Sequence, residues 1–253
     1  MQTDKRLLAI ECATEACSVA LFEDDGMQLL DHRHETIGRG HAERLIPLIA
    51  ELPDRGRAAR ILVSLGPGSF TGTRIGLAAA RSLAIAWGAE VFGYPTLALI
   101  AAMARSFDEK RDILVAMTGG HGEIFVQPFA ASGEPIESHS SLAPEAAAAR
   151  FDIDLVAGAK ASMLVEQRGF GEAHDILPDA RYANALPQAL FTDRLAPIYG
   201  RAPDAKLPQG KLRSCPRSIR SWQSWTKRSS RIGAKPGLAH KSPILSPCRT
   251  PMR

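Results

Sequence analysis

The segment from Gly66 to Gly76, GPGSFTGTRIG, constrains the fold of this chain more than any other. An apolar run at 61–65 precedes it and predicts a short buried strand, and an Ala-rich stretch at 75–87 follows it and predicts a helix. Glycine permits backbone angles that a Cβ forbids, and the start of a helix presents unpaired N–H groups. The segment therefore predicts a tight strand-to-helix turn.

Two interpretations of this turn compete. Backbone N–H groups and the helix dipole could cradle a phosphate or carboxylate, or the Ser69 or Thr71 hydroxyl could cap the helix. A phosphate-binding Walker loop has four residues before its Gly-Lys pair, whereas five residues separate Gly66 from Gly72 and Thr73 replaces the lysine. We favour the structural role and keep an anion or nucleotide contact as the alternative. The residues concerned are Gly66, Pro67, Gly68, Ser69, Phe70, Thr71, Gly72 and Arg74.

The segment LGPGSFTGTRIG at 65–76 closely resembles the signature of the YeaZ family, the TsaB-type tRNA threonylcarbamoyladenosine biosynthesis proteins. Three other segments agree with it: LLAIECATEACSVAL at 7–21, HAERLIP at 41–47 and PIYGR at 197–201. The resemblance covers about residues 5–205. It implies an α/β fold with two actin, sugar-kinase and Hsp70-like subdomains, in which mixed sheets are covered by helices.

The resemblance also implies a function. Such a protein would be the noncatalytic, activating subunit of the complex that transfers threonylcarbamoyl to N6 of adenosine 37 in tRNA. Its partner would be the catalytic subunit TsaD, which would hold the metal and threonylcarbamoyl-adenylate, and the ATPase TsaE would support turnover. A homodimer is the alternative pairing, and tRNA would be met only through the complex.

The pattern of apolar residues predicts three units. The first spans 1–110, the second is a smaller α/β unit at 111–205, and the third is the segment 206–253. No internal repeat of fixed period is visible. Strands are expected at 7–11, 17–22, 27–36, 61–65, 91–93, 113–117, 123–129 and 154–157, with a hairpin turn at 24–26. Helices are expected at 42–52, 75–87, 96–105, 142–150 after a Ser141 cap, and 187–195.

Two helices of the first unit carry small or apolar faces that would suit a partner helix. Small residues recur in the helix after the glycine turn, and the band on the preceding helix is wider than one sheet face requires. Packing on the chain's own sheet is the alternative use of these faces. The candidate interface residues are His41, Leu45, Leu48, Ile49, Gly72, Gly76, Ala79 and Ala80.

We find no catalytic machinery in the sequence. Actin-type ATPases have a glycine-rich hairpin after an acidic residue, but Glu11 is followed by Cys-Ala-Thr. Catalytic relatives carry two metal-binding histidines four positions apart, and here His41 is followed by Leu45. His32 and His34 lack a third ligand, and a Thr-Gly-Gly-His element ending at His121 departs from the family pattern. We therefore expect no metal or cofactor of its own; a stand-alone M22-type peptidase or small-molecule kinase is the alternative.

The sequence shows no apolar run of about 18 residues and no signal-peptide pattern, and we therefore expect a cytoplasmic protein without a membrane span. Four cysteines make no disulfide framework. Cys12 and Cys17 could meet across a hairpin, but we expect them to be buried thiols in a reducing compartment.

Charge is distributed unevenly along the chain. From Ala205 onward there are 12 Lys or Arg and no Asp or Glu, so 19 basic and 27 acidic residues precede this tail. The tail has no sustained apolar period, and we expect it to be disordered. Its abrupt composition favours out-of-frame translation, with a nonfunctional extension or a basic arm carrying Trp222 and Trp225 as alternatives.

Overall fold

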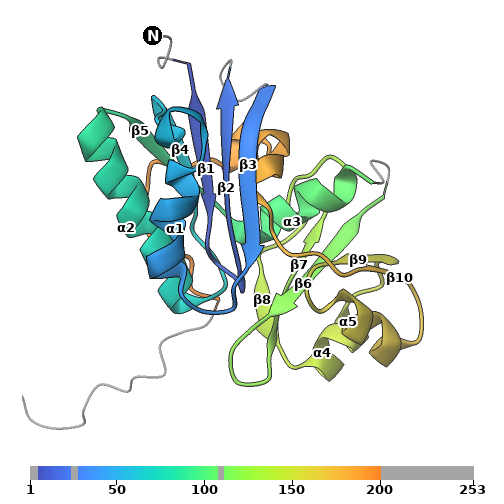
Figure 1. Cartoon of the computed structure of the whole chain (residues 1–253). Coiled ribbons are helices and arrows are strands. Elements are labelled where there is room, and N and C mark those ends of the chain that lie inside the picture. The colour runs from blue at the N-terminus through green and yellow to red at the C-terminus, as the bar shows by residue number, and fades with distance from the viewer. Residues whose placement is uncertain (1–4, 24–27, 108–110, 201–253) are drawn as a thin grey trace, which may run out of the picture. The chain divides into compact units, whose positions relative to one another are not determined.

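The computed structural model of the chain describes residues 5–23, 28–107 and 111–200. The expected hairpin turn at 24–26 and the tail at 206–253 lie outside the described residues. Within the described part, two five-stranded mixed sheets are covered by helices (Figure 1). The expected α/β class is confirmed.

The first sheet has the strand order β3-β2-β1-β4-β5. Strands β1, β2 and β3 are antiparallel neighbours, whereas β4 runs parallel to both β1 and β5. Every residue of β1 is buried because both faces of the sheet are covered. The strands are β1 (Leu7–Glu11), β2 (Ala16–Glu23), β3 (Gln28–Thr36), β4 (Arg60–Ser64) and β5 (Glu90–Tyr94).

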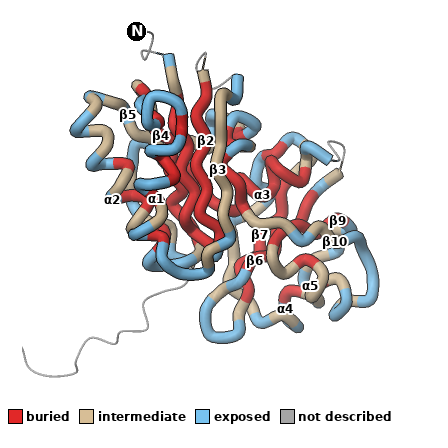
Figure 2. The backbone as a smooth tube through the Cα atoms, viewed as in Figure 1, coloured by how far each residue is buried: buried red, intermediate tan, exposed pale blue. Residues whose placement is uncertain are grey.

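Helices α1 (His41–Ala50) and α2 (Phe70–Trp87) pack on one face of this sheet, and a short 3-10 turn, η2 (Pro53–Gly56), follows α1. Their inner residues join the core cluster of that face with β1, β2 and β4. Figure 2 shows the buried strands beneath two helices whose outer sides are exposed. Each helix therefore has one side that packs on the sheet and one side that is exposed.

The second sheet repeats the topology of the first. Its order is β10-β9-β6-β7-β8, with β6, β7 and β8 antiparallel and β9 parallel to both β6 and β10. Helices α4 and α5 follow β8 and β9, just as α1 and α2 follow β3 and β4. The elements are β6 (Ile113–Thr118), β7 (Ile124–Phe129), β8 (Ser140–Leu142), α4 (Pro144–Arg150), β9 (Leu155–Ala157), α5 (Ala161–Arg168) and β10 (Glu172–His174).

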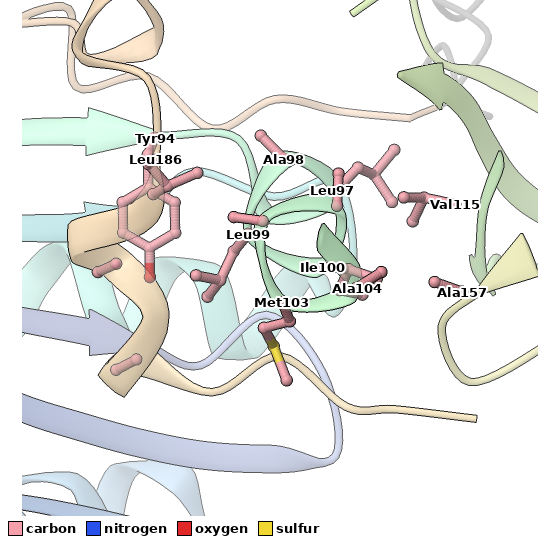
Figure 3. Close-up of a cluster of buried hydrophobic side chains, with 14 of the residues drawn as sticks. Tyr94, Leu97, Ala98, Leu99, Ile100, Met103, Ala104, Val115, Ala157 and Leu186 are labelled. Carbon is pink, nitrogen blue, oxygen red and sulfur yellow. The ribbon is translucent and has the colours of Figure 1, made fainter. Parts of the chain in front are cut away.

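We call each sheet, together with the two helices that cover it, a repeat. Helix α3 (Thr96–Arg105) packs on both repeats. It is buried from Thr96 to Ala104, and one core cluster joins it to side chains of both sheets. Figure 3 shows Leu97 next to Val115, and Leu99 on the side of Tyr94 and Leu186. Because α3 is apolar all round, it can face two sheets at once.

The end of the described chain returns to the first sheet. The turn η3 (Ala180–Ala185) is held by a 2.8 Å hydrogen bond from the Ala180 N–H to the Ser18 hydroxyl. Further along, Thr192 bridges to Gly93, and the Ile198 N–H donates to the Leu65 carbonyl at 2.7 Å. The residues after 180 thus complete the packing of the first repeat, and the boundary after residue 110 stays a prediction.

Two expected helices in the second half were wrong in extent. Residues 140–142 form β8, and Ser141 donates its hydroxyl to Glu123 at 2.6 Å instead of capping α4. At 187–195 only η4 (Gln188–Leu190) is helical, because the chain then extends to pair with Gly93. Short α5 and β10 were not anticipated. No helix among the described residues is long and apolar enough to cross a membrane.

The shared position of α3 generates a stability prediction. The side chains of Leu97 and Leu99 face different repeats. Leu97→Ala and Leu99→Ala should each lower the free energy of unfolding by about 2–5 kcal/mol in urea titrations, because each leaves a cavity in the core. Ile85→Ala, at a position 87% exposed, should change it by less than about 0.5 kcal/mol. Two separate transitions, each sensitive to one leucine alone, would contradict a core common to both repeats.

Candidate functional site

The glycine turn joins β4 to α2, and α2 begins at Phe70, five residues earlier than the apolar pattern indicates. The Ser69 hydroxyl accepts the Gly72 N–H at 3.2 Å, and the Thr73 hydroxyl donates to the Ser69 carbonyl at 2.9 Å. Ser69 is therefore the helix cap, and Thr71 is not. This capping satisfies one donor that an anion would otherwise use.

Two glycines let the start of α2 pass against the β1–β2 hairpin. A Cβ on Gly68 would lie 2.1 Å from the Ala13 carbonyl oxygen, and one on Gly72 would lie 2.0 Å from that of Cys12. The Ser69 N–H donates to the Ala13 carbonyl at 2.6 Å. Gly66 has φ +89°, in the left-handed region that favours glycine. The glycines thus fix the helix onto the hairpin.

Two cavities adjoin the turn. One of about 410 Å³ is lined from the first repeat by the hairpin residues 13–15 and by 68–70, and from the second by 117–120 and Ala159. The other, about 480 Å³, lies between the starts of α1 and α2. Glu15 is the charged residue in the lining of the first, which does not favour an anion there. A nucleotide or anion contact by the turn stays a prediction.

Glu11 is a buried carboxyl group at the end of β1. It accepts the Ala13 N–H at 2.7 Å, and the Tyr94 hydroxyl lies 3.3 Å from its other oxygen. Burial raises the pKa of Glu11 to about 7, against these hydrogen bonds, which lower it. Sequence reasoning compared Glu11 with a catalytic acid but missed its burial. The position of Glu11 at the end of an otherwise apolar strand was the signal in the sequence that could have indicated its burial.

The candidate interface residues lie largely on the inner sides of α1 and α2. Leu45, Leu48 and Ile49 pack in the core of the first sheet, and so does Ala80. Gly76 faces Val63, Cys12 and Ile10, with ordinary contacts of 3.5–3.8 Å for an added Cβ. His41 is buried, with Nε2 3.3 Å from the Ala16 carbonyl, and Ala79 is half-buried. The chain's own sheet therefore occupies most of these side chains.

The outward sides of both helices carry a different set, which we call the outer face. It comprises the eight exposed positions of these helices that carry apolar or small side chains; the other five exposed positions are Glu43, Phe70, Thr71, Arg74 and Arg81. Its members are Ala42, Ile46, Pro47 and Ala50 of α1 and Ala78, Ser82, Ile85 and Ala86 of α2, all exposed.

An aromatic cluster adjoins this face at the first turn of α2. The Arg74 guanidinium lies 3.6 Å from the centre of the Phe70 ring and donates to the Tyr199 hydroxyl at 3.0 Å. The two rings are 5.7 Å apart, and both remain about half exposed. This contact joins the PIYGR element to the glycine segment, although Arg74 and Tyr199 are 125 residues apart in the chain.

The histidines considered as metal ligands have other neighbours. His34 Nδ1 lies 3.4 Å from the buried Asp179 carboxylate, and His32 Nε2 lies 3.4 Å from the Arg181 guanidinium. His121 has a left-handed backbone, φ 58°, in the turn after β6. Residues 5–23, 28–107 and 111–200 contain no group of three His, Cys, Asp or Glu side chains suited to a metal ion.

The structure thus defines an α/β protein of two repeated mixed sheets, with a glycine turn seating a helix against the first hairpin. The family model described as TsaD, tRNA N6-adenosine threonylcarbamoyltransferase, matches residues 34–173, more than half of the chain. The chain therefore belongs to this family, and its relatives associate it with the TsaB/YeaZ group.

The TsaB protein of Escherichia coli K12 is 35% identical over 125 residues, which are 47% of this chain and 53% of that protein. The TsaB protein of Haemophilus influenzae is 32% identical over 47% of this chain and 51% of that protein. The chain spans about half the length of these curated relatives. The solved structure of YeaZ from Pseudomonas aeruginosa is 28% identical, with a TM-score of 0.65, and the match covers 77% of this chain and 99% of that one.

A pair of glycine variants tests the close approach of α2 to the β1–β2 hairpin. Gly72→Ala places a methyl group against the Cys12 carbonyl and should cost about 2 kcal/mol or more in unfolding free energy. Gly76→Ala has room and gains helix propensity, so it should be neutral or stabilising by up to about 1 kcal/mol. Equal effects in parallel denaturant titrations would refute the close approach.

The raised pKa of Glu11 generates a pH prediction. The folded chain holds this proton up to about pH 7, whereas the unfolded chain releases it near 4.5, so the Glu11 contribution to stability falls as pH rises between these values. Glu11→Gln should remove this loss and gain on the order of 2–3 kcal/mol over the native chain at pH 8, with little difference at pH 4.5. A difference that does not vary with pH would contradict the prediction.

Proposed function

We propose that this protein is the noncatalytic, activating subunit of the machinery that forms N6-threonylcarbamoyladenosine in tRNA. In this proposal the outer face of α1 and α2 binds a TsaD-type catalytic subunit. The names of its TsaB relatives support the process, and the outer face supports the mode of action.

The outer face is the observation that carries the proposal. Five positions on α1 and eight on α2 are exposed, and three of these carry charge: Glu43, Arg74 and Arg81. The outward side of a solvated helix is ordinarily polar, and contiguous apolar surface marks interaction sites. Ile46 is 48% exposed and Ile85 87% exposed, with alanines beside them. Small residues of this kind let another helix approach closely.

The second repeat offers an internal comparison. Helices α4 and α5 hold the positions on the second sheet that α1 and α2 hold on the first. Their exposed residues include Glu145 and Arg150 on α4 and Glu166 and Gln167 on α5. Three of the six exposed residues of α4 and α5 are charged, against three of thirteen on α1 and α2, so the second repeat carries the more polar surface. This difference favours the first repeat as the partner-binding half.

The aromatic cluster would form the edge of the interface. Tyrosine and arginine are enriched among the residues that dominate binding energies. Phe70, Arg74 and Tyr199 already contact one another, so little side-chain freedom remains to be lost on binding.

The proposal assigns the chemistry to the partner. A metal ion and threonylcarbamoyl-adenylate would be bound by the TsaD-type subunit, and tRNA would be met through the complex. A TsaE-type ATPase would support turnover. A second copy of this chain is the competing occupant of the outer face.

Charge substitution on the outer face tests the pairing. Ile46→Glu and Ile85→Glu should each weaken binding to the TsaD subunit of the same organism by about 10- to 100-fold in calorimetric titrations, because an apolar interface cannot solvate the carboxylate. Formation of threonylcarbamoyladenosine in tRNA by the reconstituted mixture should fall in parallel.

Ile136→Glu is the matched control, since Ile136 is 54% exposed in the second repeat. It should bind TsaD as the native chain does. Native affinity in both outer-face variants, with folding intact, would refute this interface. Normal pairing without tRNA modification in the native mixture would refute the assigned function.

A further inference from the structure

Cys12 and Cys17 form a pair of buried thiols beneath the start of α2. Neither is exposed to solvent, and their sulfur atoms lie 3.7 Å apart, within hydrogen-bond distance. Their burial as free thiols is the arrangement expected from the sequence. Their mutual geometry, and not their burial alone, distinguishes them from inert core cysteines.

The register of the hairpin makes the two residues direct neighbours across the sheet. Ile10 pairs with Val19, and Glu11 pairs with Ser18. The next step of the same register sets Cys12 opposite Cys17. Opposite residues of antiparallel strands have Cα atoms about 4.5–5.5 Å apart, inside the range of about 4.4–6.8 Å that a disulfide bridges. Side-chain rotation can therefore join the sulfur atoms without moving the strands.

We propose that Cys12 and Cys17 form a redox-active dithiol that a small hydroperoxide converts to a disulfide tying β1 to β2. The Cys17 thiolate attacks one peroxide oxygen, the O–O bond breaks, and the departing hydroxide takes up the proton lost by Cys17. The Cys12 sulfur then attacks the resulting sulfenic acid at sulfur. The S–O bond breaks, and hydroxide leaves with the Cys12 proton. Two thiols and hydrogen peroxide thus give one disulfide and two water molecules.

The surroundings of the pair assign the two roles. The hydrogen bond between the two thiols lowers the pKa of Cys17, whereas the same bond, together with burial, raises the pKa of Cys12 well above its ordinary value. Cys17 is thus the attacking thiolate and Cys12 the resolving thiol. Ala13, next to Cys12 in the chain, lines the cavity of about 410 Å³, whereas the two buried cysteines do not, so the peroxide must pass the hairpin to reach the sulfur atoms.

The disulfide would affect the contact between the start of α2 and the β1–β2 hairpin. The Cys12 carbonyl faces Gly72, and the Ala13 carbonyl accepts the Ser69 N–H. A covalent link between β1 and β2 would hold both carbonyls against the helix. Oxidation should therefore raise the melting temperature of the folded chain, and a dithiol reductant should reverse the rise.

Peptide mapping of the full chain tests the proposal. Trypsin cleaves after Arg6 and Arg33, so one peptide, residues 7–33, contains both thiols and excludes Cys215 and Cys248. After treatment of the folded chain with hydrogen peroxide and then iodoacetamide, this peptide should lack two hydrogen atoms and carry no alkyl group. Reduction before alkylation should add two alkyl groups.

Cys12→Ser is the matched control, because it keeps a hydrogen-bond donor beside Cys17. Its peptide should not form the internal disulfide. Two freely alkylated cysteines in the treated native chain, sulfinic acid at either position, or cross-links to Cys215 or Cys248 would each overturn the proposal.

Discussion

The close contact between the start of α2 and the carbonyl groups of the β1–β2 hairpin is the constraint on which the first repeat depends. Gly68 and Gly72 lie where any side chain would overlap the Ala13 or Cys12 backbone. This contact sets the height and direction of α2 above the sheet, and α1 packs beside α2. Phe70 and Arg74 lie in the first turns of the helix that this contact holds, and Cys12 provides one of the two carbonyl groups that the glycines face. The glycine segment therefore has a structural role: it holds α2 in place against the hairpin. The capping of α2 by Ser69 agrees with that role.

The repeated topology shows how one architecture can carry different surfaces. Each repeat has three antiparallel strands, two parallel strands and two covering helices, yet no periodicity links their sequences. The repeats share α3, whose all-round apolar character allows it to pack on both. The segment after residue 180 then returns to the first sheet and supplies Tyr199 to the cluster on α2. The outer face thus belongs to a half that both ends of the described chain help to build.

Much of this structure could be predicted from particular residues. The strand at Leu7–Glu11 and the helix at Thr96–Arg105 have the expected bounds, because short apolar runs ended by turn or capping residues leave little freedom. The expected helix at 187–195 was wrong because pairing of Thr192 with Gly93 is a long-range contact that local pattern does not contain. The same limit applies to the candidate interface residues. Spacing identified the small and apolar stripes containing Gly76 and Leu45, but only the fold shows that these face the core and that Ile46 and Ile85 face outward.

Hydrogen exchange on this protein, alone and mixed with the TsaD-type subunit proposed to bind it, tests the proposed interface most directly. The account predicts that amides in α1 and α2 gain protection in the mixture, whereas those of α4 and α5, the equivalent helices of the second repeat, exchange as before. Protection confined to α4 and α5, with α1 and α2 unchanged in a stable complex, would contradict it.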